Sequence, residues 1–402
     1  MSEQQPPRRL TRKELMRRNK KIAKRRQQRL TVIVVALTAF MFYITGLYGT
    51  SLAYLGDFVS SGMVYLQFGD GFPVQIENQT YKQSEQMGSA LCLLDSEKLS
   101  FYTPTGDLAH SYYHSMQNPV ISASSKRVAI YNANDTSLKI ANASNILFSQ
   151  EMQNDIIHAS LSANNWVAVT TKSQSYNGEV KVFDSQMQEQ FTWKSAKSFP
   201  LQSFLSPKSQ TLLVSTISAK DGKAISCVYI IDATNGAERY IIEDSENVML
   251  AAEFVKEESV IIFFTDKAVC LDLSQEEVNV TAEYSYKNKD LLSYDVKNSQ
   301  VVMAIGDYDG AETADLVITN LQLDETYRTQ CSQDVNRVVI ASQRIYALGG
   351  ETVFQYTTEG VFVTQQEVKN NIKNIVDYNG CVAVYGDSLE KVEKVKAEKT
   401  KN

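Results

Sequence analysis

Short apolar runs separated by turn residues fill the chain from residue 81 onward. In one unit the run Trp166–Thr171 is followed by a turn at Tyr176–Gly178 and a second run at Glu179–Asp184. Such runs, rich in β-branched residues and bounded by Asn-Gly or Asp-Gly, predict β-strands joined by tight hairpins. No segment of this region shows the periodicity of a long amphipathic helix. The pattern therefore predicts an all-β fold.

The strongest apolar run of each unit recurs at a regular interval. Its positions are 37 to 48 residues apart, with a mean of about 42, and are Leu91, Val128, Val167, Leu212, Val260, Val301, Ile345 and Val382. The sequence repeats of four-stranded propeller blades are about 40 to 45 residues long. We therefore predict a β-propeller with eight blades. Seven blades are the alternative if one unit is degenerate, and two stacked β-sandwiches are the other all-β alternative.

Glycine-containing turns support this division into units. Asp221-Gly222 and Asp309-Gly310 separate the first and second runs of two units. A second set of turns follows the second run, at Pro104–Gly106, Thr234–Gly236 and Thr358–Gly360. Glycine suits such turns because it adopts positive φ without steric cost.

The two ends of the repeat region predict how the ring closes. The last unit, near residues 372–395, lacks an outer strand, and the segment Phe72–Ile76 precedes the first complete unit. If this segment supplies the missing strand, both ends of the chain join one blade and no strand edge is left open there.

An uncharged segment precedes the repeats. Residues 30–56 contain no Asp, Glu, Lys or Arg, and this run of 27 residues exceeds the roughly 20 that a helix needs to cross a bilayer. Residues 1–29 hold twelve Lys or Arg, whereas the next basic residue after the run is Lys82. Because cytoplasmic flanks are rich in Lys and Arg, we predict a transmembrane helix with a cytoplasmic N-terminus and an extracytoplasmic remainder.

A cleaved signal peptide is the competing interpretation of this segment. Ser51–Ala53 resembles a small-residue cleavage site. The apolar region of a signal peptide is about 7 to 15 residues long, however, and its basic region is short. Both features of this chain favour an uncleaved anchor in the plasma membrane.

The predicted organisation has five parts. They are a basic cytoplasmic tail at 1–29, a transmembrane helix at 30–56, a stalk and entry strand at 57–80, a β-propeller at 81–396 and a charged C-terminal tail at 397–402. The basic tail at 1–29 has twelve basic and two acidic residues, which gives a net charge of +10. Residues 30–402 have 28 basic and 44 acidic residues, which gives a net charge of −16. The tail therefore suits contact with anionic lipid. The acidic body favours basic partners.

One segment and the overall layout carry a family resemblance. Ile231–Tyr240 resembles the strand-turn-strand signature of quinoprotein-like and WD40-like propellers. The order of basic tail, single anchor and outer propeller resembles an uncharacterised, domain-of-unknown-function family of membrane-anchored propeller proteins from Gram-positive bacteria. The Trp of the quinoprotein repeat is absent, with Tyr240 near its place, and the WD dipeptide is also absent. The resemblance implies a fold and a topology but no reaction.

The histidines and acidic loops predict no metal site. His110 and His114 are expected to be polar residues on an outer strand, where they lie about 13 Å apart, too far for a shared metal ion. Neither they nor His158 has an acidic partner at metal spacing. Asp307–Glu312 resembles part of a calcium loop, but the ligand series does not continue after Gly310, so a hairpin turn is the preferred interpretation.

Other candidate residues also have structural interpretations. The five cysteines are far apart, form no CxxC pair and are predicted to be buried and free: Cys92, Cys227, Cys270, Cys331 and Cys381. The acidic pairs Glu257-Glu258 and Glu276-Glu277 are predicted to be solvated turn residues. No nucleophile motif or phosphate-binding glycine loop is present. We therefore assign no catalytic, cofactor-binding or metal-binding residue.

These observations favour a binding or scaffold protein and not an enzyme. The expected partners are envelope proteins or cell-wall polymers, and nucleic acid is not expected. Two alternatives remain open. An extracytoplasmic hydrolase or lyase would place two carboxylates from distant blades at the central channel. A ligand sensor would signal through the membrane helix to the tail.

Overall fold

A computed structural model describes residues 71–76, 80–220, 222–275, 277–306, 313–332, 334–369 and 371–395. The chain divides into two compact units, residues 1–60 and 61–402, and every described residue belongs to the second. The predicted basic tail, the predicted membrane helix, most of the stalk and the C-terminal tail lie outside the described residues. Within the described ranges, no helix is long and apolar enough to cross a membrane.

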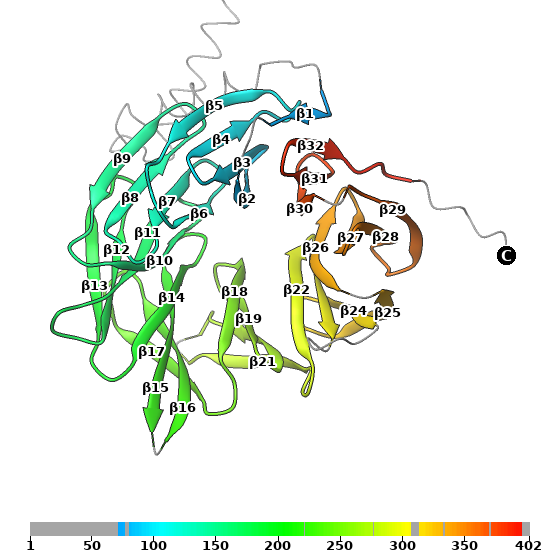
Figure 1. The fold of residues 1–402 in the computed structure, drawn as a ribbon. Helices are drawn as coiled ribbons and strands as arrows, with labels where there is room; N and C mark the ends of the chain where they lie inside the picture. The colour runs from blue at the N-terminus through cyan, green and yellow to red at the C-terminus, as the bar shows by residue number, and fades with distance from the viewer. Residues whose placement is uncertain are drawn as a thin grey trace, which may run out of the picture. The chain divides into compact units, whose positions relative to one another are not determined.

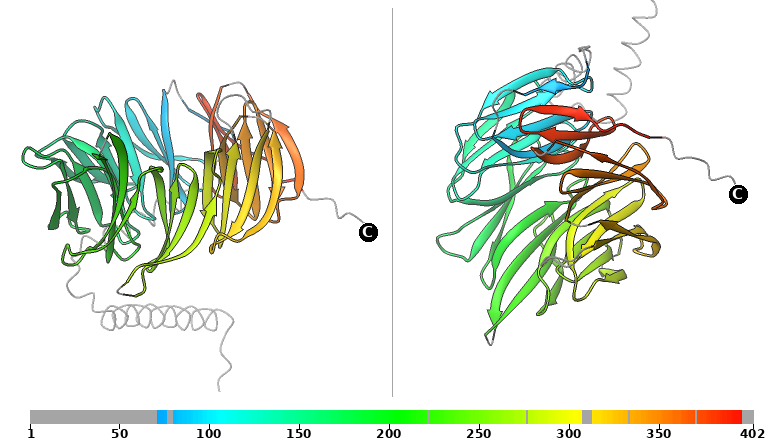
Figure 2. Two further views of the ribbon diagram at one scale, coloured as in Figure 1. Left: turned by 90° about the horizontal axis from the view of Figure 1, so that it is seen from below. Right: turned by 45° about the vertical axis from the view of Figure 1, so that its right-hand side comes forward.

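Eight four-stranded antiparallel sheets form the blades of a propeller around a central opening (Figure 1). Figure 2 shows the disc from the side, with the strands running between its two faces. The predicted eight-bladed propeller is therefore confirmed, and the alternatives of seven blades and of two sandwiches are wrong.

The strands follow one order in every blade, from the central opening outward. Blades one and two consist of β2 (Tyr81–Met87), β3 (Ala90–Asp95), β4 (Lys98–Tyr102), β5 (Leu108–Tyr113), β6 (Pro119–Ala123), β7 (Val128–Asn132), β8 (Ser137–Ala141) and β9 (Ile146–Glu151). Blades three and four consist of β10 (Ile156–Leu161), β11 (Val167–Thr171), β12 (Gly178–Phe183), β13 (Glu189–Ser195), β14 (Phe199–Leu205), β15 (Thr211–Lys220), β16 (Lys223–Asp232) and β17 (Glu238–Asp244).

The remaining blades repeat this order, and the last one is completed by the first strand of the chain. Blades five and six consist of β18 (Met249–Lys256), β19 (Ser259–Phe264), β20 (Lys267–Asp272), β21 (Asn279–Ser285), β22 (Asp290–Lys297), β23 (Gln300–Gly306), β24 (Thr313–Asn320) and β25 (Glu325–Ser332). Blades seven and eight consist of β26 (Val335–Ala341), β27 (Arg344–Gly349), β28 (Thr352–Thr357), β29 (Phe362–Glu367), β30 (Ile372–Asp377), β31 (Cys381–Tyr385), β32 (Ser388–Lys391) and β1 (Val74–Gln75).

The second strand of each blade forms the core. All eight apolar positions that define the sequence repeat lie on these strands, β3, β7, β11, β15, β19, β23, β27 and β31, and none is more than 1% exposed. Apolar clusters also join neighbouring blades, as where Ile140 of β8 packs in one cluster with Val169 of β11. Burial of one such aliphatic side chain stabilises a fold by about 1.5 to 3 kcal/mol. The sequence repeat therefore reflects the packing of each blade against its neighbours.

Strand β1 closes the ring. It pairs antiparallel with β32, with Val74 opposite Leu389, and the N–H of Ile76 donates to the carbonyl of Asp387 at 2.7 Å. Ile76 is 4% exposed, and the ring of Phe72 packs edge-on against Tyr378. The prediction that Phe72–Ile76 supplies the missing outer strand is confirmed.

One face of the propeller carries two sets of hairpin turns, and we call it the turn face. Antiparallel strands alternate in direction, so the turn between the first and second strands and the turn between the third and fourth strands reach the same face. The predicted turns ending at Gly106, Gly236 and Gly360 all join third to fourth strands, and each of these glycines has positive φ. The predicted turn at Asp309-Gly310 lies outside the described residues.

Candidate functional site

Polar side chains tie the innermost strands of neighbouring blades together. Gln83 of β2 accepts from the N–H of Ile121 on β6 at 3.0 Å and donates to its carbonyl at 2.9 Å. On the other side of the ring, a carboxylate oxygen of Asp295 on β22 accepts from the N–H of Ile340 on β26 at 2.6 Å. These bonds use side chains to extend the backbone pairing around the ring. They fix the spacing of the strands that line the central opening.

His158 is one of these bridges. It lies on β10, and its Nδ1 accepts from the N–H of Ser203 on β14 at 3.3 Å. Its ring lies beside Phe204, with centroids 5.2 Å apart. Burial lowers the pKa of His158 to about 4, so the imidazole is neutral at physiological pH. This histidine has a structural role.

The other two histidines are separated by the end of a strand. His110 lies on β5 and is exposed, as predicted for an outer strand. His114 lies just beyond β5 and is buried, so its predicted place on the outer strand is wrong. Its Nε2 lies 3.0 Å from the carbonyl oxygen of Asp95, and its Nδ1 accepts from the N–H of Met116 at 3.0 Å. It holds the connection between the first two blades.

The cysteines and metal predictions have mixed outcomes. All five cysteines are buried and free, as predicted. The calcium-like segment 307–312 lies outside the described residues. In the part of the chain that the structure describes, no group of three or more His, Cys, Asp or Glu side chains is placed to hold a metal ion.

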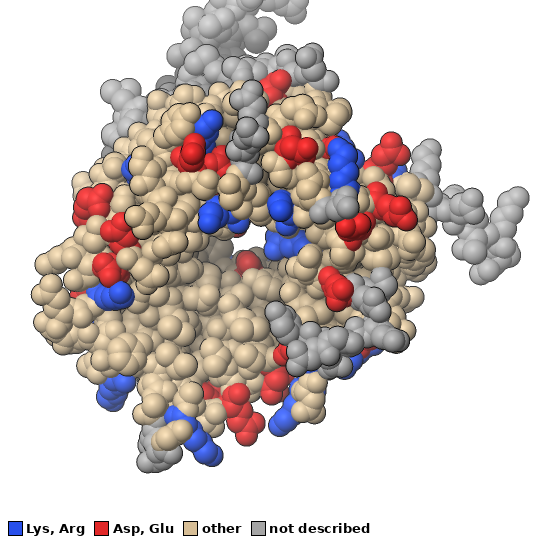
Figure 3. Space-filling view, viewed as in Figure 1, with Lys and Arg blue, Asp and Glu red and all other residues tan. Residues whose placement is uncertain are grey.

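The central opening is lined with charged side chains. Lys and Arg side chains surround part of its rim, and an acidic side chain is visible deeper inside (Figure 3). Glu85 of β2, Glu253 of β18 and Asp295 of β22 belong to one electrostatic group with Arg337 of β26. Because these strands come from four blades, the group converges from across the ring.

Glu253 has the most altered acidity in this group. Its confined position among protein atoms raises its pKa from 4.5 to about 7, and the negative charge of Asp295 adds to the effect. The hydroxyl of Tyr294 lies 3.4 Å from Oε1 of Glu253. Burial also raises the pKa of Glu85 and of Asp295, and the charge of Arg337 opposes all three shifts. The opening therefore holds an acid that titrates near neutral pH.

Lys297 crosses one end of the opening. It lies at the end of β22, forms an ion pair with Asp377 at the end of β30 and approaches Oε1 of Gln86 on β2 at 3.5 Å. One side chain thus connects three inner strands. Lys297 and Glu253 also line a pocket of about 250 Å³ between β18 and β22.

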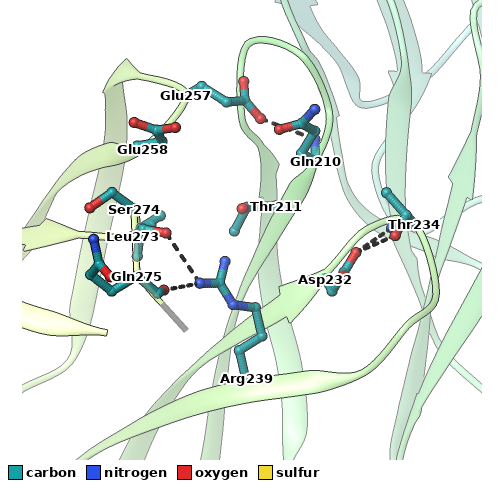
Figure 4. A pocket seen from close by; sticks show the side chains of 10 residues that line it. All are labelled: Gln210, Thr211, Asp232, Thr234, Arg239, Glu257, Glu258, Leu273, Ser274 and Gln275. Atoms are coloured by element: carbon teal, nitrogen blue, oxygen red, sulfur yellow. Dashed lines mark hydrogen bonds between the residues drawn. The ribbon is translucent and has the colours of Figure 1, made fainter. Parts of the chain in front are cut away.

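A larger pocket lies between blades four and five at the turn face, and we call it the inter-blade pocket (Figure 4). Its volume is about 340 Å³. Ten residues in or next to four turns line it: Gln210, Thr211, Asp232, Thr234, Arg239, Glu257, Glu258, Leu273, Ser274 and Gln275. Nearly all of these side chains are polar, whereas ligand pockets are usually mostly apolar. The inter-blade pocket is therefore suited to a polar ligand.

Glu257 holds the two blades together above the inter-blade pocket. It lies in the turn between β18 and β19, and its carboxylate accepts from Ser206 Oγ and Lys208 N at 2.5 Å each and from Gln210 N at 3.2 Å. The prediction that Glu257 is simply solvated is therefore wrong, because the turn of the neighbouring blade uses its carboxylate as a cap. Glu258 is exposed, as predicted.

The opposite wall of the pocket is held by Arg239. Its Nη2 donates to the carbonyl oxygens of Leu273 at 3.1 Å and Gln275 at 2.5 Å. The carboxylate of Asp232 is also held in place, because its Oδ1 accepts from the N–H of Thr234 at 2.8 Å. These bonds and the nearby charge of Arg239 lower the pKa of Asp232 in spite of its partial burial. The pocket is thus preformed, with a permanent guanidinium and an ionised carboxylate.

Thr211 contributes a hydroxyl to this pocket. The residue is only 4% exposed, and its hydroxyl makes no hydrogen bond with the described residues and is accessible from the pocket. Figure 4 shows the hydroxyl among the side chains that converge from the two blades. A bound molecule can therefore form a hydrogen bond with this hydroxyl in exchange for one with water.

Comparison with known proteins establishes the family. A family model matches residues 73–394, which is nearly the whole propeller. The chain belongs to the DUF5711 family. This is a family of unknown function. The expectation of a domain-of-unknown-function propeller family is confirmed, while membrane anchoring and a Gram-positive source remain predictions.

Solved structures share the fold of this DUF5711 protein. BamB from Moraxella catarrhalis matches with a TM-score of 0.54 at 13% identity, over 81% of this chain and 98% of that one. Saccharomyces cerevisiae Sqt1 matches with a TM-score of 0.59 at 8% identity, over 82% and 100%. AztD from Citrobacter koseri matches with a TM-score of 0.52 at 13% identity, over 78% and 90%. No curated protein matches the sequence. At these identities the likeness shows the fold alone.

Proposed function

We propose that this DUF5711 protein is a single-pass plasma-membrane protein whose propeller lies outside the cytoplasm and binds envelope partners. The charge pattern supports the topology, since twelve basic residues precede an uncharged run of 27 and an acidic remainder follows it. The basic tail would rest on anionic lipid at the cytoplasmic surface. The anchor would hold the propeller close to envelope proteins and cell-wall polymers.

The inter-blade pocket is the observation that carries the binding role. It is preformed by bonds between two blades, and it presents the hydroxyl of Thr211, which makes no hydrogen bond with the described residues. A rigid pocket loses little conformational entropy when a ligand binds. Its place at the turn face keeps it open to large partners as well as small ones.

Crosslinking in intact cells tests this role. The full-length protein would be crosslinked to its neighbours, purified and compared with the double variant Thr211→Val and Glu258→Gln. Glu359→Gln, in an exposed turn of blade seven, serves as the matched control. We expect one or more envelope components to be recovered with the parent protein and the control but not with the double variant. Equal recovery with all three proteins would contradict a binding role for this pocket.

A second candidate function rests on Glu253. An acid whose pKa is about 7 is suited to proton transfer at neutral pH, and it lines a pocket together with Lys297. A hydrolase or lyase acting on an envelope polymer would use it as general acid or base. The test is turnover of such polymers by the purified full-length protein. Turnover that Glu253→Gln abolishes would favour the enzyme, and turnover that survives this change would exclude Glu253 as its acid.

A further inference from the structure

The inter-blade pocket presents hydrogen-bond donors and acceptors side by side. Arg239 uses one of its terminal nitrogens on backbone carbonyls, and among the described residues the rest of its guanidinium has no hydrogen-bond partner. The hydroxyl of Thr211 lies in the same pocket. Glu258 supplies a carboxylate, which only accepts hydrogen bonds while ionised, whereas the oxygens of Asp232 already accept from Thr234 and Asn235.

This mixture excludes ligands of a single kind. A simple cation such as a lysine ammonium only donates, so it would leave the guanidinium of Arg239 without an acceptor although the net charge of the lining attracts it. A carboxylate or phosphate only accepts, so it would leave Glu258 without a donor and would be repelled by the charges of Asp232 and Glu258. Either ligand would bury unsatisfied polar groups, which is costly.

Hydroxyl groups satisfy both kinds of partner, since each one donates once and accepts twice. A ring that carries several hydroxyls can bond a carboxylate and a guanidinium at the same time. The pocket volume of about 340 Å³ lies at the lower end of the range for small-molecule sites, about 300 to 1,000 Å³. The lining has three carboxylates and one guanidinium, so its formal charge is −2, which disfavours acidic sugars.

We infer that the inter-blade pocket binds a non-anionic saccharide unit. The inference rests on the proposed binding role and names its ligand class. Arg239 and Thr211 would bond sugar oxygens at the floor of the pocket, and Glu258 would accept from sugar hydroxyls or amides at its mouth. Glu257 would position the two blades without contacting the sugar, because its oxygens are already bonded to the neighbouring turn.

Calorimetric titration of the purified full-length protein tests this inference. The probes are an N-acetylated chitotetraose as neutral saccharide, a tetragalacturonate as acidic saccharide, tetralysine as simple cation and dialanine as a small zwitterion. We expect binding of the neutral saccharide alone. Thr211→Val should weaken that binding about three- to tenfold, the effect of one lost hydrogen bond, and Glu359→Gln should leave it unchanged.

The Thr211→Val variant is well suited to this test. Because the hydroxyl has no partner among the described residues, its removal should not lower the melting temperature of the protein. Weaker binding can then be separated from loss of fold. Binding of tetralysine, tetragalacturonate or dialanine in place of the neutral saccharide would overturn the inference, as would no binding at all. If the pocket-dependent crosslinks of the preceding section survive that outcome, the binding role stands and only the ligand class is wrong.

Discussion

Two glycines of blade seven allow the packing between blades to be measured. Gly360 lies in the turn between β28 and β29 with φ of +77°, and Gly350 lies in the turn between β27 and β28 with φ of +54°. A Cβ at Gly360 would meet Cδ1 of Tyr327 at 2.1 Å and Cδ1 of Ile318 at 2.9 Å, both on blade six, whereas a Cβ at Gly350 would meet nothing within 4 Å. The two positions share the backbone strain and differ in the steric clash.

The expected cost follows from these two terms. Alanine at positive φ costs about 1 kcal/mol at either position. Gly360→Ala adds an overpacking term of about 1 to 2 kcal/mol. Tyr327 is 39% exposed and can turn away from the new methyl group, but Ile318 is fully buried and cannot. We therefore expect destabilisation by about 1 kcal/mol for Gly350→Ala and about 2 to 3 kcal/mol for Gly360→Ala.

Urea unfolding of the purified full-length protein, followed by circular dichroism, measures both costs. The Gly350→Ala variant is the control for backbone strain, so the difference between the two variants reports the contact between blades six and seven. Equal destabilisation by the two substitutions would refute the packing of the β28–β29 turn against β24 and β25.

Three further predictions concern acids and ring closure. Folding raises the pKa of Glu253 from 4.5 to about 7, so the stability of the protein falls as pH rises through this window. Glu253→Gln should therefore stabilise the protein by about 1 kcal/mol near pH 8 and have no effect near pH 4. Urea midpoints at the two pH values check this, and an effect of the same size at both would contradict it. Glu257→Ala should cost about 1 to 2 kcal/mol by thermal unfolding because it removes the cap on the blade-four turn, while its neighbour Glu258→Ala should change stability by less than about 0.5 kcal/mol. Ile76→Ala should cost about 2 to 4 kcal/mol and should expose β32 to proteolysis, because Ile76 is buried beside the closing strand; an unchanged cleavage pattern would contradict the closure.

The fold was predictable because it depends on a repeated local pattern. Each apolar position of the repeat, such as Leu91 or Val260, lies in a β-rich run that is buried on both sides. Eight such runs at a regular interval are compatible with few folds other than a propeller. The closing strand was predictable for the same reason, since one unit lacked a strand and Phe72–Ile76 was left over.

The candidate site was not predictable because its residues come together only through the position of one blade against the next. Thr211 begins an ordinary strand, Arg239 lies in another, and Glu258 lies in a turn of the following blade. Thr211 and Glu258 belong to no local motif, and the Ile231–Tyr240 signature that contains Arg239 implied a fold and no binding site. Glu257 looked like a solvated acid because its hydrogen-bond donors are about 50 residues away in the sequence. The place of the Thr211 hydroxyl in the pocket also has no sequence signal, because the neighbouring blade supplies part of the lining.

The most direct test of the account is the compartment in which the propeller lies. All five native cysteines are buried, so the folded protein offers no thiol of its own to a surface reagent. Ser125→Cys would place one thiol in the exposed turn between β6 and β7. The account predicts that a membrane-impermeant maleimide labels this variant on intact cells and leaves the parent protein unlabelled. Labelling of Ser125→Cys only after the cells are permeabilised would place the propeller in the cytoplasm and contradict the account.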